Sequence, residues 1–239
     1  MSIFKTLFSS LQTKVFNFFF TPPYGFPKII FEAYLKTTYS DINTPFCFIQ
    51  VGANDGISYD TLFQFVTGRN QVKGIVIEPI KDYFDDLVQN YRLFPDIIPV
   101  NKAIHPTLKK IDMFRLAKNK ENLSPEWAKG IASIYPKHHL KSQTPTAFIV
   151  NETVEAQTLM SVYTHFKARL GPIDLIQIDV EGFDRQIIKM IDFRQLTPQI
   201  IKYEHVNLSK IDYCRAYLHL QKSGYIIFND GSDLIAIKK

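Results

Sequence analysis

The chain has 239 residues, of which 46% are hydrophobic, and its formal net charge is +5. This length fits one α/β domain with additional segments, and the hydrophobic content supplies a full core and excludes a disordered chain. The basic residues are scattered along the sequence and never form a dense run, so we do not expect nucleic acid as a partner. No apolar run reaches the length of a membrane span, and no small-residue cleavage site of a signal peptide is found.

The two cysteines, Cys47 and Cys214, have no spacing typical of a metal or redox motif. Unpaired thiols are typical of a reducing compartment. The expected location is therefore the cytoplasm, and peripheral attachment to a membrane through residues 1–20 is left open.

The first 40 residues are predicted to form a helical extension, and the main domain is predicted to span residues 41–239. Apolar residues recur at helical spacing within residues 1–20, which indicates an amphipathic helix. Two roles are open for this helix: contact with a membrane surface or partner, or packing on the domain as a brace. Its polar face carries only Lys5 and Lys14, which favours the brace. A Pro-containing linker and a short helix at 29–38 follow it.

Strands and helices alternate from residue 46 onward, which predicts a parallel sheet with helices on both faces. The predicted strands are 46–51, 73–77, 96–100, 111–116, 147–154, 173–182 including a polar tip, 199–203, 224–228 and 234–237. The predicted helices are 57–67, 80–92, 158–170, 183–192 and 209–222. The strand at 111–116 interrupts the alternation because no crossover helix follows it. The last two strands are separated by Asn-Asp-Gly-Ser-Asp, a turn typical of a hairpin.

An irregular segment at about 117–147 is predicted to form a lid-like insert in the main domain. It holds the only tryptophan, Trp127, and the neighbouring histidines His138 and His139. An aromatic side chain and a histidine would suit a loop that holds a sugar and removes a proton, with His139 as a catalytic candidate. The alternative is a surface loop anchored by Trp127.

Polar residues stand at the carboxyl ends of five predicted strands, where open α/β sheets bind their ligands. The first strand ends in a tight Gly turn that can let the backbone approach a ligand. Glu78 ends the second strand, where an acid would hold the hydroxyls of a ribose. The polar residues at these five ends are Gly52 and Asn54, Glu78, Asn101, Asp179 and Glu181, and Glu204 and His205.

Three motifs resemble those of the FkbM-type S-adenosylmethionine-dependent methyltransferases. They are Val-Gly-Ala-Asn-Asp-Gly at 51–56, Ile-Glu-Pro at 77–79 and Ile-Asp-Val-Glu-Gly at 178–182, in the order and spacing of the family. The resemblance covers about residues 46–238. It implies a class I methyltransferase fold, which is Rossmann-like with a seven-stranded, mostly parallel sheet and a C-terminal antiparallel hairpin. It also implies S-adenosylmethionine as the cofactor.

By this resemblance, Gly52 and Asn54 would lie against the methionine part of the cofactor. Glu78 would hold the ribose, and Asn101, Lys102 and Ala103 would border the adenine. The candidate cofactor-binding residues are Gln50, Gly52, Asn54, Asp55, Glu78, Asn101, Ala103 and Asp179. Two positions depart from the family pattern, because Gln50 stands where an acid is usual and Gln177 where a lysine is frequent. Gln50 brings no charge near the methionine amino group.

The predicted reaction is methylation of a hydroxyl on a sugar, surface glycan or secondary metabolite. A general base would then remove the hydroxyl proton. The candidates at the strand ends are Asp179, Glu181, Glu204 and His205. Asp179 and Glu204 are alternatively ligands of a divalent cation such as Mg²⁺, which prefers oxygen. Structural roles are also open for this group, with Glu181 as a helix cap and His205 as a buried histidine.

Two other functions compete with methyl transfer. A nicotinamide-dependent oxidoreductase would need glycines at the positions that Asn54 and Ile57 occupy. A non-catalytic binding protein of the same fold would be compatible with Gln50 and Gln177.

Overall fold

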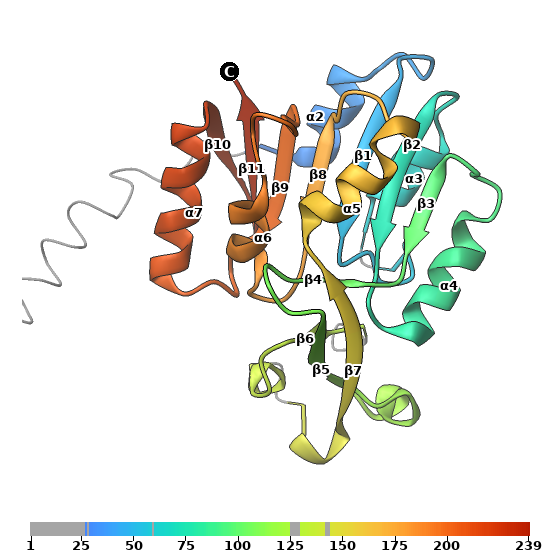
Figure 1. Ribbon diagram of the computed structural model, residues 1–239, viewed down its shortest axis with the longest axis vertical. Helices are drawn as coiled ribbons and strands as arrows, with labels where there is room; N and C mark the ends of the chain where they lie inside the picture. The colour runs from blue at the N-terminus through green and yellow to red at the C-terminus, as the bar shows by residue number, and fades with distance from the viewer. Residues whose placement is uncertain (1–26, 28, 59, 125–129, 142–143) are drawn as a thin grey trace, which may run out of the picture.

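The computed structural model describes residues 27, 29–58, 60–124, 130–141 and 144–239. The amphipathic helix predicted for residues 1–20 and the side chain of Trp127 lie outside these residues. Figure 1 shows a large sheet with helices packed on it and a small second sheet at the ends of its strands. None of the helices in the described part of the chain is long and apolar enough to cross a membrane.

The large sheet has seven strands in the order β10-β11-β9-β8-β1-β2-β3. All neighbouring strands pair in parallel except β11, which is antiparallel to both β9 and β10. The predicted fold is therefore confirmed, including the antiparallel hairpin at the C-terminus. The strands are β1 Phe46–Val51, β2 Val72–Ile77, β3 Ile97–Val100, β8 Leu175–Ile178, β9 Ile200–Glu204, β10 Tyr225–Asp230 and β11 Asp233–Lys238.

Burial explains why these segments are strands in the middle of the sheet. Every residue of β1 and of β8 is buried, so both strands read as continuous apolar runs broken only by Gln50, in β1, and Gln177, in β8. Such runs are typical of parallel strands that are covered on both faces. β1 lies between β2 and β8, which places the turn after β1 at the middle of the carboxyl edge.

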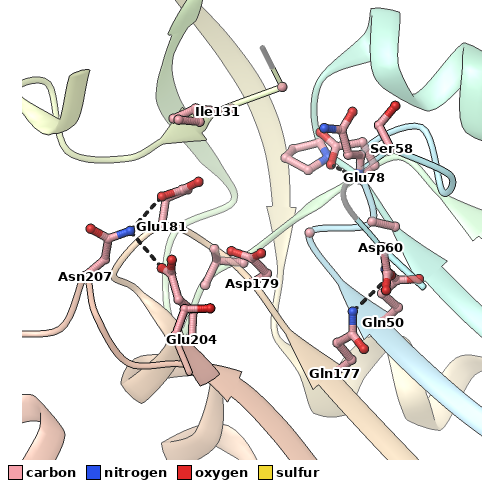
Figure 2. Close-up of a pocket in the computed structure, with 18 of the residues that line it drawn as sticks. Gln50, Ser58, Asp60, Glu78, Ile131, Gln177, Asp179, Glu181, Glu204 and Asn207 are labelled. Carbon is pink, nitrogen blue, oxygen red and sulfur yellow. Dashed lines mark hydrogen bonds between the residues drawn. The ribbon is translucent and has the colours of Figure 1, made fainter. Parts of the chain in front are cut away.

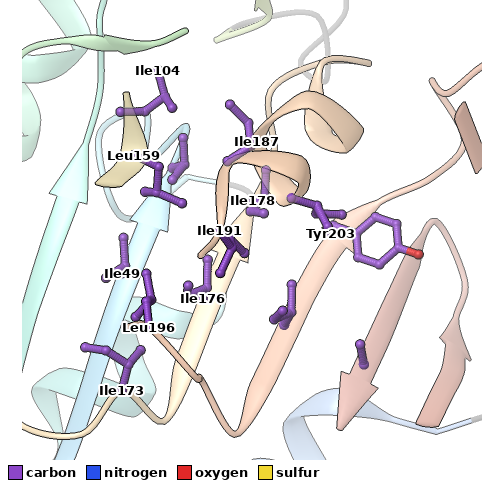
Figure 3. Packing of buried hydrophobic residues seen from close by; sticks show 14 of the residues in the cluster. Ile49, Ile104, Leu159, Ile173, Ile176, Ile178, Ile187, Ile191, Leu196 and Tyr203 are labelled. Atoms are coloured by element: carbon purple, nitrogen blue, oxygen red, sulfur yellow. The ribbon is translucent and has the colours of Figure 1, made fainter. Parts of the chain in front are cut away.

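Helices cover both faces of the large sheet and enclose two apolar clusters. One face packs against α2 Phe31–Thr38, α3 Leu62–Thr67 and α4 Lys81–Tyr91, which bury Phe31, Leu62 and Leu87. The other face packs against α5 Leu159–Phe166, α6 Asp184–Met190 and α7 Lys210–Lys222. Figure 3 shows this second cluster, in which isoleucines of the sheet lie against Leu159, Ile187 and Ile191.

Two predicted helices are shorter than their sequence patterns indicate. The helix predicted for 57–67 begins only at Leu62, because Asp55 accepts hydrogen bonds from the backbone N–H groups of Ile57 and Ser58 and holds this stretch as a loop. The helix predicted for 158–170 starts after Thr158, whose side chain caps it. It ends at Phe166 and continues as a short 3₁₀ helix, η5 Lys167–Arg169.

The strand that interrupts the alternation belongs to a second sheet with the order β4-β7-β5-β6. Its strands are β4 Ala103–Ile104, β5 Lys110–Leu116, β6 Ala132–Ser133 and β7 Ile149–Gln157. β5 and β7 pair in antiparallel fashion, and the predicted insert connects them. The described part of the insert also contains the 3₁₀ helices η1 Lys118–Leu123, η3 His138–Leu140 and η4 Thr146–Phe148. In Figure 1 this second sheet lies beyond the carboxyl ends of the parallel strands.

Candidate active site

A cavity of about 600 Å³ lies at the carboxyl ends of β1, β2, β8 and β9. The turns that follow these strands supply most of its wall. The second sheet and the insert add Met113, Gly130, Ile131, Ala132, His138 and Lys141, and the hairpin of β10 and β11 adds Ser232 and Asp233. Figure 2 shows Glu78 and Asp60 on one side of this cavity and Glu181, Glu204 and Asn207 on the other. Ligands of open α/β sheets bind at this edge.

The turn after β1 brings the backbone against the end of β8. Gly52 has a φ of +80°, and a Cβ there would come within 1.8 Å of the backbone oxygen of Asp179. Only glycine fits this approach. Asn54, with a φ of +49°, also adopts the left-handed conformation, which asparagine tolerates better than most residues. Gly52 and Asn54 both line the cavity.

Glu78 lies at the end of β2 and joins two turns. One carboxylate oxygen accepts the N–H of Asn54 at 3.0 Å, and the other accepts the N–H of Ile80 at 2.8 Å. Burial of the side chain raises the pKa of Glu78 to about 7. Each carboxylate oxygen keeps a lone pair for a further donor. Because Glu78 lines the cavity, it can accept hydrogen bonds from a ligand that carries hydroxyl groups.

The opposite side of the cavity is acidic. The amide nitrogen of Asn207 donates to Glu181 at 2.9 Å and to Glu204 at 2.8 Å, so it holds two carboxylates next to each other (Figure 2). Burial, followed by the negative charge of Glu181, raises the pKa of Glu204 to about 7. A carboxylate with such a pKa can exchange a proton near neutral pH.

Asp179 lies between these two sides in Figure 2 and also lines the cavity. Solvent reaches its side chain through the open cavity. Even so, desolvation by the surrounding protein, and then the charges of Glu181 and Glu204, raise the pKa of Asp179 well above its usual range. Carboxylates whose pKa values are raised in this way are typical of acid–base sites.

The insert contributes His138 to the cavity. Its Nε2 lies 2.8 Å from a carboxylate oxygen of Glu181, and the hydroxyl of Ser133 donates to the backbone oxygen of Glu181 at 3.2 Å. His139, the residue proposed from the sequence, does not line this cavity, and its Nε2 lies 3.1 Å from the hydroxyl oxygen of Thr146. Adjacent residues of a 3₁₀ turn point in different directions, so only one of the two histidines reaches the acidic side.

Four other residues predicted for the site lie outside the cavity wall, which contains none of Asp55, Asn101, Ala103 and His205. Asp55 accepts hydrogen bonds within its own loop, and Asn101 donates to the backbone oxygens of Glu78 and Pro79. Both therefore shape turns that border the cavity. Ala103 is part of a small apolar cluster, and the ring of His205 lies 3.1 Å from the backbone oxygen of Gly231.

The described residues contain no group of three or more His, Cys, Asp or Glu side chains arranged to hold a metal ion. Asp179 and Glu204, proposed as metal ligands, therefore lack a third protein ligand within the described ranges. The metal site gains no support from this arrangement and stays a prediction. Glu181 faces Asn207 and His138 instead of capping α6, whose first turn has no side-chain cap.

Gln50 and Gln177 lie opposite each other on β1 and β8, and both donate through their amide nitrogens to one carboxylate oxygen of Asp60. All three residues line the cavity. The sequence analysis missed Asp60, His138 and Asn207 as site residues. Asp60 lies inside the helix predicted for 57–67, and its partner Gln177 is distant in sequence, so no local pattern marked it as a site residue.

Comparison with known proteins agrees with this architecture. Residues 50–227 match the family described as the methyltransferase FkbM domain. A search of curated proteins gave no match. Among solved structures, methyltransferase FkbM from Methylobacillus flagellatus KT superposes with a TM-score of 0.53 at 10% identity. That superposition covers 88% of this chain and 48% of the other, so this chain spans about half the length of that protein.

Two further structures are similar at lower scores. Fibrillarin from Aeropyrum pernix, solved with natively bound S-adenosyl-L-methionine, has a TM-score of 0.44 at 11% identity, covering 82% of this chain and 68% of that one. Precorrin-6y C5,15-methyltransferase from Geobacter metallireducens GS-15 has a TM-score of 0.45 at 12% identity, covering 87% of each chain.

The family match covers most of the chain, and the seven-stranded sheet has the class I methyltransferase arrangement expected from the sequence motifs. The nicotinamide alternative has no counterpart in the family match. This chain belongs to the FkbM methyltransferase family.

Proposed function

We propose that this protein uses S-adenosylmethionine to methylate a hydroxyl group of a sugar, surface glycan or secondary metabolite. The observation that carries the proposal is the division of one cavity into two sides. One side has the Gly52 turn and Glu78, and the other has carboxylates with raised pKa values. The first side suits a nucleoside cofactor, and the second suits a group that must lose a proton.

The residues of the first side fit the cofactor. The close approach of Gly52 to the end of β8 leaves a cradle that a Cβ would fill. Glu78 keeps acceptor capacity toward the cavity, which suits the two hydroxyls of a ribose. When bound, S-adenosylmethionine supplies an electrophilic methyl group. The role of this chain is to bind it in the orientation that lets an acceptor oxygen approach the methyl group in line.

The second side supplies the base. In its ionised form, Glu204 would accept the proton of the acceptor hydroxyl, while the methyl group would pass from sulfur to that oxygen and S-adenosylhomocysteine would be released. Glu181 tunes this step, because its negative charge disfavours a second ionised carboxylate nearby. Asn207 holds Glu204 in place through its hydrogen bond.

The polar wall of the acceptor side supports a hydroxyl-rich acceptor. Besides the carboxylates, it contains Lys141, Asn207 and Ser232. Lys141 donates to the backbone and side-chain oxygens of Asn207, so the insert is attached to the loop after β9. We infer that the insert helps to select the acceptor. The absence of nucleic acid as a partner, the membrane contact of residues 1–20 and the cytoplasmic location stay predictions.

The test measures formation of S-adenosylhomocysteine with a panel of sugars, glycans and small alcohols as acceptors. With an acceptor that turns over, Glu204→Gln should lower kcat by on the order of 10²–10⁴-fold, because a positioned base is lost. Its affinity for S-adenosylhomocysteine should stay at the wild-type value. In the wild type, kcat/KM should rise as the pH rises through about 7, where Glu204 ionises.

Glu155→Gln is the matched control, because Glu155 is an exposed acid that pairs with Lys102 outside the cavity wall. Its kinetics should equal those of the wild type. Failure of the protein to bind S-adenosylmethionine at all would overturn the whole proposal. Turnover confined to amine or carbon acceptors would overturn the hydroxyl acceptor alone.

A further inference from the structure

A row of polar side chains crosses the apolar middle of the large sheet. Gln50 on β1 lies opposite Gln177 on β8, and Gln177 lies opposite Lys202 on β9. Gln50 is 2% exposed and Gln177 is 5% exposed. Burying a polar amide is unfavourable unless its hydrogen-bonding groups find partners. The partners of these two glutamines therefore indicate what the row is for.

Asp60 accepts the hydrogen bond of each glutamine's amide nitrogen. Its Oδ2 atom accepts the Nε2 groups of both Gln50 and Gln177, the latter at 3.0 Å, and its Oδ1 atom accepts the N–H of Leu62 at 2.9 Å. An ionised carboxylate can only accept hydrogen bonds, so the donor end of each amide must face it. The orientation of both amides is thereby fixed.

The amide oxygen of each glutamine differs from the amide nitrogen in this respect. Within the described residues, the Oε1 atoms of Gln50 and Gln177 are buried and have no hydrogen-bond partner. Both side chains and Asp60 line the cavity. These amide oxygens are closed to solvent, so the acceptor that this group offers to the cavity is the partly exposed carboxylate of Asp60. A carboxylate there matches a cationic group with several N–H donors, because a primary ammonium group has three donors and no acceptor.

The lysine of this row is paired with another acid. Lys202 forms an ion pair with Asp233, with 3.0 Å between Nζ and Oδ2. The negative charge of Asp60 therefore faces the cavity with two amides as its only side-chain partners among the hydrogen bonds and ion pairs of the described residues.

We propose that Asp60, held in place by Gln50 and Gln177, binds the amino group of the methionine part of S-adenosylmethionine. This inference rests on the proposed function. It assigns the charge that Gln50 cannot supply to a residue ten positions later in the chain, and it makes the two glutamines the supports that position this charge.

Calorimetry with two ligands tests the assignment. One ligand is S-adenosylhomocysteine, and the other is its analogue in which a hydrogen replaces the amino group. Asp60→Asn should weaken binding of S-adenosylhomocysteine by on the order of 10- to 100-fold, the usual size of a lost hydrogen bond to a charged group. Binding of the deaminated analogue should not be weakened. Gln177→Met, which removes one of the two amides that hold Asp60, should give a smaller loss with the same selectivity.

Asp192→Asn is the matched control. Asp192 also accepts a backbone N–H two residues ahead, from Arg194, and a glutamine amide, from Gln195, but it lies outside the cavity wall. This variant should bind both ligands as the wild type does. Thermal unfolding of each variant establishes that it is folded.

Equal weakening of both ligands by Asp60→Asn, or no weakening of either, would overturn the assignment and make Asp60 a support of the loop only. If Gln177→Met weakens both ligands equally, or weakens neither, the glutamines do not position Asp60 for the amino group. If the wild type binds neither ligand, the proposed function fails with it, so the two failures are distinguishable.

Discussion

Glu78 is buried at the end of β2, yet both of its carboxylate oxygens accept a backbone N–H group. The side chain therefore fixes the turns on either side of it and still presents acceptor capacity to the cavity. Glu204 has a pKa raised to the same value of about 7, but its partner is a side-chain amide, and a second carboxylate lies beside it. The same residue type is thus suited to accepting hydrogen bonds from a ligand in one place and to exchanging a proton in the other.

At the residue scale, Glu78→Gln tests the ribose contact. The amide group of glutamine would turn a donor toward the N–H of either Asn54 or Ile80, and one acceptor for the ligand would be lost. We expect affinity for S-adenosylhomocysteine to fall by on the order of 10- to 100-fold by calorimetry. Glu32→Gln, on the exposed side of α2, is the control. Wild-type affinity in a folded Glu78→Gln protein would limit Glu78 to shaping the loop.

At the scale of elements, the turn between β1 and α3 determines where the cavity lies. Ile57, Ser58 and Asp60 lie outside α3, where the sequence predicts the first turns of a helix, and hydrogen bonds to Asp55 and Asp60 hold this region. This arrangement places Asp60 next to the two glutamines of β1 and β8. An earlier start of α3 would carry Asp60 into the helix and away from them.

Two glycines with positive φ distinguish the cost of a strained backbone from the cost of a steric clash. Gly52 and Gly231 have φ values of +80° and +69°, but a Cβ on Gly231 meets nothing within 4 Å. Gly231→Ala should lower the free energy of unfolding by about 1–2 kcal/mol, the usual value for an L-residue in this conformation. Gly52→Ala should lower it by more than about 3 kcal/mol and abolish binding of S-adenosylhomocysteine, because the Cβ collides with Asp179. Urea unfolding and calorimetry provide the measurements, and equal losses of stability would contradict the close approach.

At the scale of the whole molecule, the fold concentrates acids at one edge of the sheet. Asp179 and Glu204 end adjacent parallel strands, and Glu181 follows Asp179 across a turn with positive φ. Their mutual repulsion opposes folding when they are ionised. We therefore expect the acidic side of the cavity to lower the free energy of unfolding when its carboxylates are ionised.

The pH dependence of stability tests this conclusion. The pKa of Glu204 in the folded protein is about 7, above its ordinary value of 4.5, so the folded state holds more protons than the unfolded state between these pH values. The contribution of Glu204 to stability is full below about pH 4.5 and is lost as the pH rises through 7. Glu204→Gln removes this loss, so the free energy of unfolding of the variant should rise relative to the wild type between pH 5 and 8. Urea unfolding at several pH values measures it, and a difference that is constant with pH would refute the shift.

The sequence by itself determined the features that depend on local chain properties. Apolar runs, helical periodicity and turn residues predicted the parallel sheet, its covering helices and the final hairpin. The glycine turn and the acids at strand ends also pointed to the edge where the cavity lies, because strand direction alone brings those ends together. Only the tertiary structure decided which side chains face the cavity. It selected His138 over His139, turned Asn101 and His205 toward backbone oxygens, and joined Asp60 to Gln50 and Gln177. The physical reason is that side-chain direction depends on partners from distant parts of the chain, which a local pattern does not contain.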